Sequence, residues 1–266
     1  MELSIYQVDA FTSKAFTGNP AGVCITNESL SDDLMLSIAR EMAVSETAFL
    51  SLEDMTLRWF TPEVEVALCG HGTLSVAHIL VETGQAKVDE VITFNTLSGV
   101  LTAKVTPTDI QLILPTAQLT AAQAIDDQLL KALGLRDDQI VSLASFDSKQ
   151  LIEVADEQVV INLSPDFNAM KKLEGRGVVV TSISSKPNLD FMSRYFAPWV
   201  GINEDPVTGS NHCALSLFWS EKLDKTELKA YQASARGGYI GMKLMPDNQT
   251  TLIGKALTTI KGVMLV

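Results

Sequence analysis

The sequence predicts an α+β protein of two pseudo-symmetric lobes, each a largely antiparallel β-sheet wrapped around a central buried helix. Two observations predict this class. A segment of the form Arg-aromatic-Phe-x-Pro begins at Arg58 and again at Arg194, and each copy leads to a glycine corner, Gly70 or Gly209. Self-similarity at about half the chain length indicates two copies of one unit. An apolar run follows each corner, and a helix that is apolar on most sides must be enclosed by other elements.

The first lobe is expected to begin with strands at 3–11 and 21–26, where alternating or apolar residues are separated by the turn Gly18-Asn19-Pro20. Ser31, followed by Asp32 and Asp33, is typical of a helix start, because a hydroxyl cap and early carboxylates satisfy free N–H groups. Further strands are predicted at 44–50 and 57–60, a buried helix at 70–81, and strands at 91–95, 99–105 and 110–114.

The domain boundary is predicted after Pro115, where Thr, Ala, Gln and Asp replace apolar residues. This places an N-terminal lobe at 1–116 and a C-terminal lobe at 117–266, with the active site in the cleft between them. The last strand, about 258–266, is expected to cross back to the first lobe. In the second lobe we expect helices at 127–133, 166–173 and from Gly209, strands at 139–143, 150–153, 178–182 and 189–196, and short strands after Leu228.

Composition excludes several functions. The formal charge of −12 repels phosphate backbones and anionic lipid, so no nucleic-acid or membrane partner is expected. No secretory signal or membrane-length apolar run is visible, and three widely spaced cysteines suit a reducing, cytoplasmic location. None of the three histidines is paired with a cysteine or carboxylate at metal-ligand spacing, so a metal site is not expected.

The two buried helix starts are the predicted chemical centre. A helix N-terminus offers unpaired N–H groups and partial positive charge, so it binds anions, and Gly70, Gly72 and Gly209 let a ligand approach the backbone. These glycines equally permit tight corners. A dinucleotide fingerprint at Gly70 is disfavoured, because its lead-in is not a tight strand-to-helix turn. Pseudo-twofold duplication predicts that the two helix starts face each other.

Three side chains fall at predicted junctions around this cleft. Glu46 lies where a helix gives way to a strand, and either a cleft-facing or a solvent-facing carboxylate fits that position. His71 lies in a helix first turn, where the dipole favours its neutral form. Asp205 precedes Pro206 and suits either capping of the helix or orienting a base.

Motifs along the whole chain resemble the PhzF-like isomerases, which share the diaminopimelate-epimerase fold. The resemblance is carried by Val8-Asp9-Ala10-Phe11, Gly18-Asn19-Pro20-Ala21-Gly22-Val23, Ser45-Glu46-Thr47-Ala48-Phe49, Phe60-Thr61-Pro62 with Glu65, Leu68-Cys69-Gly70-His71-Gly72-Thr73, Glu204-Asp205-Pro206-Val207-Thr208-Gly209-Ser210, and Gln232 with Ser234, Arg236, Gly237 and Gly238.

The resemblance implies a cofactor-independent proton transfer on a small carboxylic acid. In the phenazine-pathway member of that family, which is biosynthetic, a glutamate moves a proton between ring carbons of a dihydro-hydroxyanthranilate. The matching general acid/base here is Glu46, with His71, Asp205 and Ser210 orienting and hydrogen-bonding the substrate. Its carboxylate would be contacted by Gly70, Gly72, Thr73 and Gly209. The resemblance also implies a homodimer.

Two alternatives remain. An amino-acid epimerase or racemase of this fold uses two thiols, one at each helix start. Cys69 occupies the first thiol position, but the second is Thr208, whose alcohol is too weakly acidic to serve as a carbon base. The other alternative is a non-catalytic small-molecule-binding or interaction protein, which has no need of Glu46, His71, Asp205 and Ser210 together.

Overall fold

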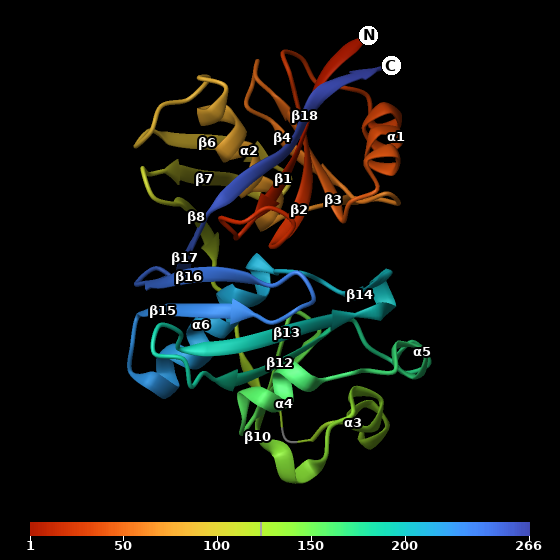
Figure 1. Cartoon of the computed structure of the whole chain (residues 1–266), viewed down its shortest axis with the longest axis vertical. Helices are drawn as coiled ribbons and strands as arrows, with labels where there is room; N and C mark the ends of the chain where they lie inside the picture. The colour runs from red at the N-terminus through yellow and green to blue at the C-terminus, as the bar shows by residue number, and fades with distance from the viewer. Residues whose placement is uncertain (123) are drawn as a thin grey trace. The chain divides into compact units, whose positions relative to one another are not determined.

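The computed structural model describes residues 1–122 and 124–266, and the chain forms two compact units (Figure 1). The first unit comprises Met1–Leu114 and Thr251–Val266, and the second comprises Pro115–Thr250. The division into lobes at 116 and 117 remains a prediction. Residue 123, in the predicted boundary segment, lies outside the described residues.

A six-stranded sheet forms the larger part of the first unit. Its order is β18 (Ala256–Leu265), β1 (Glu2–Ala10), β2 (Asn19–Thr26), β3 (Glu46–Ser51), β4 (Leu57–Phe60) and β5 (Glu65–Val66). Adjacent strands are antiparallel except β2 and β3, which are parallel. A parallel pair requires a crossover connection, and helix α1 (Asp32–Met42) supplies it.

Helix α1 begins and ends as its sequence predicts. The Ser31 hydroxyl accepts a hydrogen bond from the Leu34 N–H, and Asp32 and Asp33 lie in the first turn. Its apolar face packs on the sheet in a cluster that contains Met35 and Ile38. Burial of this apolar face therefore holds α1 against the sheet as the connection between the parallel strands β2 and β3.

The first unit also contains β6 (Val91–Thr96), β7 (Gly99–Val105), β8 (Ile110–Pro115) and the buried helix α2 (Gly70–Glu82). Strands β6, β7 and β8 pair antiparallel in that order. Helix α2 contacts β1, β2, β3, β7 and β18, so strands enclose it on several sides. Leu74, Val76 and Ile79 have no exposed surface, which confirms the expectation of an enclosed helix.

A second sheet organises the second unit, in the order β16 (Gly238–Met245), β15 (Glu227–Gln232), β13 (Phe191–Ala197), β12 (Val178–Ile183), β11 (Lys149–Val154), β10 (Ile140–Phe146) and β9 (Thr120–Ala121). The pairs β13–β15 and β11–β12 are parallel, and the short β14 (Ile202–Glu204) pairs with β13. Strand β17 (Gln249–Gly254) contains the boundary between the two units.

Helix α6 (Gly209–Leu223) is the buried helix of the second unit and contacts β15 and β16. Its core side chains include Trp219, whose indole N–H donates to the Thr181 hydroxyl at 3.0 Å, and Phe191 stacks on the same ring. The expectation of a second enclosed helix from Gly209 is confirmed.

Three short helices form a separate hydrophobic cluster in the second unit: α3 (Asp127–Leu133), α4 (Glu157–Asn162) and α5 (Phe167–Met170). Single 3-10 turns occur at η1 (Asp137–Gln139) and η2 (Pro198–Val200). Helix α3 ends at Gly134 in the left-handed region, as predicted. Helix α4 was not predicted, and α5 is shorter than the predicted helix at 166–173.

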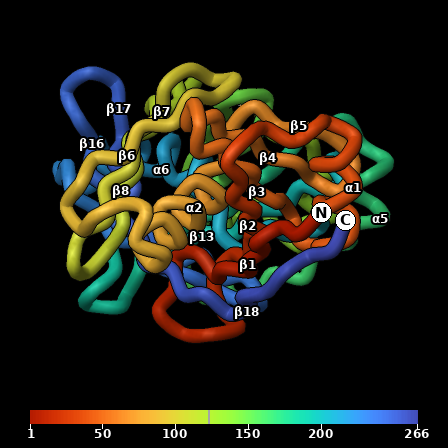
Figure 2. Tube along the Cα trace, turned by 90° about the horizontal axis from the view of Figure 1, so that it is seen from above, coloured from red at the N-terminus to blue at the C-terminus, as the bar shows by residue number. Residues whose placement is uncertain are grey.

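The fold class is confirmed: the protein is α+β, with a mainly antiparallel sheet and one buried central helix in each unit. The chain termini meet in the first unit, where β18 pairs with β1 from Glu2↔Leu265 to Ala10↔Ala256. Figures 1 and 2 both show the N- and C-termini side by side, and the Val266 N–H donates to the Met1 carbonyl at 2.9 Å.

Candidate functional site

Two element starts bring Glu46 and His71 together in the first unit. Glu46 is the first residue of β3, and His71 is the second residue of α2. The Glu46 Oε2 atom lies 3.4 Å from His71 Nε2, and the two side chains are 17% and 8% exposed. The carboxyl group of Glu46 therefore faces a buried imidazole within the first unit, and its position in a cleft remains a prediction.

Neighbouring groups define the orientation of the imidazole. The Asn19 amide nitrogen lies 3.5 Å from His71 Nδ1, and the Ser45 hydroxyl lies 3.4 Å from His71 Nε2. With an amide donor at Nδ1, the neutral ring carries its hydrogen on Nε2, which is the nitrogen that faces Glu46. In this tautomer the Nε2–H group lies on the side of the ring that faces the Glu46 carboxyl group, 3.4 Å away.

Burial raises the pKa of the Glu46 carboxyl group, and a hydrogen bond from Ser45 opposes the shift in part. Burial penalises the charged form, so the group moves towards the pH range in which it can both take and give a proton. This is the property that a single acid/base carboxyl group needs.

Cys69 is the N-cap of α2, and its Sγ atom accepts a hydrogen bond from the Gly72 N–H at 3.4 Å. A Cβ atom on Gly72 would lie 2.8 Å from Trp59 Cδ1 and 3.0 Å from Cys69 Sγ. The lack of a side chain at Gly72 is therefore required by close packing inside the first unit. Thr73 donates both its N–H and its hydroxyl to the Cys69 carbonyl, at 3.0 and 2.7 Å.

Glu46, Cys69 and His71 each place one ligand atom within 4.8 Å of the others. In the sequence no histidine is paired with a cysteine or carboxylate at metal-ligand spacing, and the structure nevertheless brings these three residues together. Short sequence spacing could not reveal the group, because Glu46 comes from a different element. Thiolate, imidazole and carboxylate are ligands that zinc accepts, so metal-free chemistry at this group remains a prediction to be tested.

The second unit holds Asp205, Gly209 and Ser210 at the start of α6. The Asp205 carboxylate accepts a hydrogen bond from the hydroxyl of Thr208, the N-cap residue of this helix. The Gln232 side chain accepts from the Thr208 N–H at 2.9 Å and donates to the Asp205 carbonyl at 2.7 Å. Gln232 is 1% exposed, so the acidic turn is held by a buried amide.

Ser210 is partly exposed, and its hydroxyl has no hydrogen-bond partner among the residues that the structure describes. It lies one position after Gly209, in the first turn of α6. A hydroxyl placed there can donate to or accept from a ligand beside the helix N–H groups.

His212 has a structural role in the same helix. Its Nδ1–H donates to the Thr208 carbonyl at 2.8 Å, and its Nε2 lies 3.5 Å from the Ser193 hydroxyl. Burial lowers the pKa of His212 to about 4, so the ring is neutral at pH 7.

The predicted site residues thus form two sets, each within one unit. Glu46, Gly70, His71, Gly72 and Thr73 belong to the first, and Asp205, Gly209 and Ser210 belong to the second. Sequence reasoning assigned no site role to Asn19, Ser45 and Gln232, although all three stand in the motifs of the family resemblance. Their presence in those motifs was the available signal.

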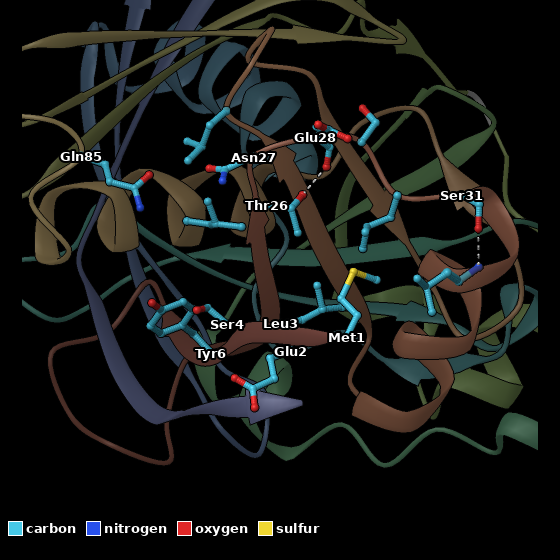
Figure 3. A pocket seen from close by; sticks show the side chains of 15 residues that line it. Met1, Glu2, Leu3, Ser4, Tyr6, Thr26, Asn27, Glu28, Ser31 and Gln85 are labelled. Carbon is cyan, nitrogen blue, oxygen red and sulfur yellow. Dashed lines mark hydrogen bonds between the residues drawn. The ribbon is translucent and has the colours of Figure 1, made fainter. Parts of the chain in front are cut away.

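A surface pocket of about 740 Å³ in the first unit contains none of these residues. Figure 3 shows its lining residues, which include Met1, Glu2, Tyr6 and Gln85, and the hydrogen bond that the Thr26 hydroxyl donates to the Glu28 carbonyl, with a length of 2.7 Å. Its two carboxyl side chains, Glu2 and Glu28, belong to exposed residues, whereas the carboxyl group of Glu46 is largely buried.

Within the described part of the chain, no helix has the length and apolar character needed to cross a membrane.

The fold first defines a class. The structure of a predicted epimerase from Pseudomonas aeruginosa superposes with a TM-score of 0.76 over 99% of both chains. The sequence identity is 18%, so this similarity shows a shared fold. The family follows from closer similarities. The model for phenazine biosynthesis-like proteins matches residues 8–262, and the chain belongs to this PhzF-like family.

Two relatives illustrate the match. A protein of Halalkalibacterium halodurans named an uncharacterized isomerase is 45% identical over all of both chains. The crystal structure of a phenazine biosynthesis protein of the PhzF family from Enterococcus faecalis has 36% identity and a TM-score of 0.92, again over all of both chains.

Proposed function

We propose that this chain is a cofactor-independent isomerase that moves a proton between two carbons of a small carboxylic acid. The observation that carries the proposal is the buried Glu46 carboxyl group, which lies against His71 and has a raised pKa. Membership of the PhzF-like family and the isomerase name of a relative support the same reaction type.

In this mechanism the Glu46 carboxylate removes a proton from one substrate carbon, and the electron pair of the broken C–H bond passes into the conjugated system of the acid. The Glu46 carboxylic acid then returns the proton to a second carbon, so the net reaction consumes nothing. His71 orients Glu46 through its Nε2–H. A single group that acts first as base and then as acid works best with a pKa near the working pH.

The proposal assigns residues of both units to one substrate. Asp205 and Ser210 hydrogen-bond it, and Gly70, Gly72, Thr73 and Gly209 contact its carboxylate. The two donors of Thr73 already reach the Cys69 carbonyl, so a ligand contact there would have to replace one of these hydrogen bonds.

The test is incubation of the enzyme with a panel of small unsaturated carboxylic acids in deuterated water, followed by NMR and mass spectrometry. An isomer, with or without solvent deuterium, is expected with the wild type and not with Glu46→Gln or Asp205→Asn. Glu63→Gln, at an exposed position, serves as the matched control and should retain activity. Turnover that persists in Glu46→Gln would remove the proposed mechanism.

Metal independence is tested in the same assay. Dialysis against a chelator is expected to leave the rate unchanged, because the proposed steps use only the carboxyl group and the imidazole. A rate that falls on chelation and returns with zinc would instead assign Glu46, Cys69 and His71 as metal ligands.

An epimerase or racemase with two thiols is the second candidate. Its two thiol positions correspond to Cys69 and Thr208, which are the N-caps of α2 and α6. The threonine alcohol cannot replace a thiol as a carbon base at neutral pH. Racemisation that is lost in Cys69→Ala and retained in Glu46→Gln would favour this candidate over the isomerase.

A homodimer and a cytoplasmic location complete the proposal. Light scattering coupled to size-exclusion chromatography is expected to give twice the 28.8 kDa mass of the chain. If no acid of the panel binds or reacts, the third candidate, a non-catalytic binding or interaction protein, replaces the enzyme.

A further inference from the structure

Lys149 is a buried cation in the second unit. It closes the hairpin between β10 and β11, where Phe146 pairs with Lys149 across a turn of Asp147 and Ser148. Both turn residues have positive φ, as a two-residue type I′ hairpin turn requires. The side chain of Lys149 is turned into the protein, and the residue is 8% exposed.

The surroundings of the Lys149 ammonium group are unusual for a buried charge. Its Nζ atom donates to Asn211 Oδ1 at 2.9 Å and lies 5.2 and 5.6 Å from the ring centres of Phe146 and Tyr195. No Asp or Glu among the described residues forms an ion pair with it. Buried lysines are normally paired, because desolvation of the charge is costly.

Burial is also the largest influence on the pKa of Lys149, which it lowers. The charges of Asp147 and Asp205 act in the opposite direction, and that of Arg176 adds to the lowering. The protein therefore keeps a lysine at a position that disfavours its charged form, and this burial of the charge costs stability.

The partner of Lys149 is itself incompletely satisfied. Asn211 lies in the first turn of α6, directly after Ser210, and is 1% exposed. Its Nδ2 atom is buried and has no hydrogen-bond partner among the described residues. A buried amide N–H₂ without an acceptor costs free energy and is rare in folded proteins.

Lys149 and Asn211 both lack the same kind of partner, which is a negatively charged hydrogen-bond acceptor. Lys149 has N–H donors and a positive charge without a counter-charge, and Asn211 has an amide donor without an acceptor. Both lie at the N-terminus of α6, where the helix dipole makes a buried cation still less favourable. An anion with at least two acceptor oxygens would accept hydrogen bonds from the Lys149 ammonium group and from the Asn211 amide, and it would balance the positive charge.

We propose that Lys149 and Asn211 form a binding subsite for the carboxylate group of an organic acid, at the N-terminus of α6. The identification of this acid as the substrate rests on the proposed function. The inference places the charged group that recognises the acid in the second unit. A chain of net charge −12 needs such a local positive group to hold an anionic ligand.

The test uses isothermal titration calorimetry with acetate, benzoate, succinate and maleate, with acetamide and benzamide as neutral counterparts and sulfate as an inorganic anion. At least one acid is expected to bind the wild type saturably and more tightly than its amide. Lys149→Met should weaken that binding about ten-fold or more, and Asn211→Leu several-fold, since each removes a donor to a desolvated charge. Lys243→Met, which removes an exposed charge of the same unit, should change nothing.

A structural role for Lys149 is separated by thermal unfolding. Lys149→Met is expected to melt at the same temperature as the wild type or higher, because the variant removes a buried unpaired charge. A variant that melts much lower would show that Lys149 supports the fold, and the proposal would then be overturned. No acid bound by the wild type, equal binding by Lys149→Met, or equal affinity for sulfate would also overturn it.

Failure of this inference is distinguishable from failure of the proposed function. Glu46→Gln should bind the acid with wild-type affinity while losing isomerisation, because Glu46 belongs to the other set of residues. Lys149-dependent binding without any isomerisation would leave the subsite in place and remove the enzyme.

Discussion

Burial favours the neutral form of three ionisable side chains. It raises the pKa of Glu46 and lowers the pKa of Lys149 and of His212. The number of hydrogen-bond partners distinguishes the residue with a structural role from the two residues that we assign to binding or catalysis. His212 has a partner for each ring nitrogen, so its neutral form is fully satisfied. Lys149 has a single hydrogen-bond partner, the neutral amide of Asn211, and the Glu46 carboxyl group faces the imidazole of His71. Burial without full satisfaction is typical of groups kept for binding or catalysis.

At the residue scale, Glu46→Gln is expected to stabilise the protein at pH 8. Because burial raises the pKa of Glu46, its stabilising contribution is fully present below the unfolded value of 4.5 and is lost as pH rises through the folded value. Glutamine keeps the shape without the charge, and each unit of pKa shift corresponds to about 1.4 kcal/mol.

Thermal unfolding of both proteins at pH 4 and pH 8 measures the effect. The variant should be more stable at pH 8 and equal to the wild type at pH 4. A variant less stable at pH 8 would mean that the Glu46–His71 contact stabilises the fold by more than burial of the charge costs.

At the scale of elements, the starts of α2 and α6 are built differently despite the repeated sequence pattern. Cys69 caps α2 with its sulfur atom, whereas the Thr208 side chain makes no capping hydrogen bond and donates to Asp205 instead. The second start is held from outside, by Gln232 at the end of β15. The acidic turn of Asp205 is therefore positioned by a neighbouring strand.

Gln232→Leu should destabilise the protein by about 1–3 kcal/mol, because it removes the two hydrogen bonds that the buried amide makes to the Thr208 N–H and to the Asp205 carbonyl. Gln249→Leu, at an exposed position of β17, is the matched control and should change stability by less than about 0.5 kcal/mol. Urea denaturation measures both. Equal stabilities of the two variants would show that the Gln232 clamp contributes nothing.

At the scale of the whole molecule, β18 joins the end of the chain to its beginning. The strand adds to the edge of the first sheet through its pairing with β1, and Met1 and Val266 exchange backbone hydrogen bonds. Figure 2 shows the two termini side by side. The pairing of β1 with β18 therefore gives the sheet of the first unit contacts between residues that lie far apart in the sequence.

A circular permutant tests this closure. Joining residue 266 to residue 1 with a short Gly/Ser linker, and opening the chain between Pro187 and Asn188 in an exposed turn, should give a folded protein that melts within about 5 °C of the wild type. A permutant opened between Tyr6 and Gln7, inside β1, should fail to fold. Circular dichroism and thermal melting report both outcomes, and loss of structure in the first permutant would contradict the closure.

Much of the fold was predictable, because its signals are local. The cap at Ser31, the glycine corners at Gly70 and Gly209 and the apolar runs after them place three helices correctly. Helix α4 was missed because its residues Val159, Val160 and Ile161 are β-branched and favour a strand in isolation. Residues distant in the sequence hold the start of α4, because the Glu157 carboxylate accepts hydrogen bonds from the Ser184 hydroxyl and from the Ser185 N–H.

By itself, the sequence determined the α+β class, the two buried helices and the family, because periodicity, caps and ordered motifs are carried by neighbouring residues. The tertiary structure alone decided which distant side chains meet: Asn19 with His71, Lys149 with Asn211, and Gln232 with Thr208. Strand order and register set such contacts, and a shift of one residue in register would turn each strand side chain to the opposite face.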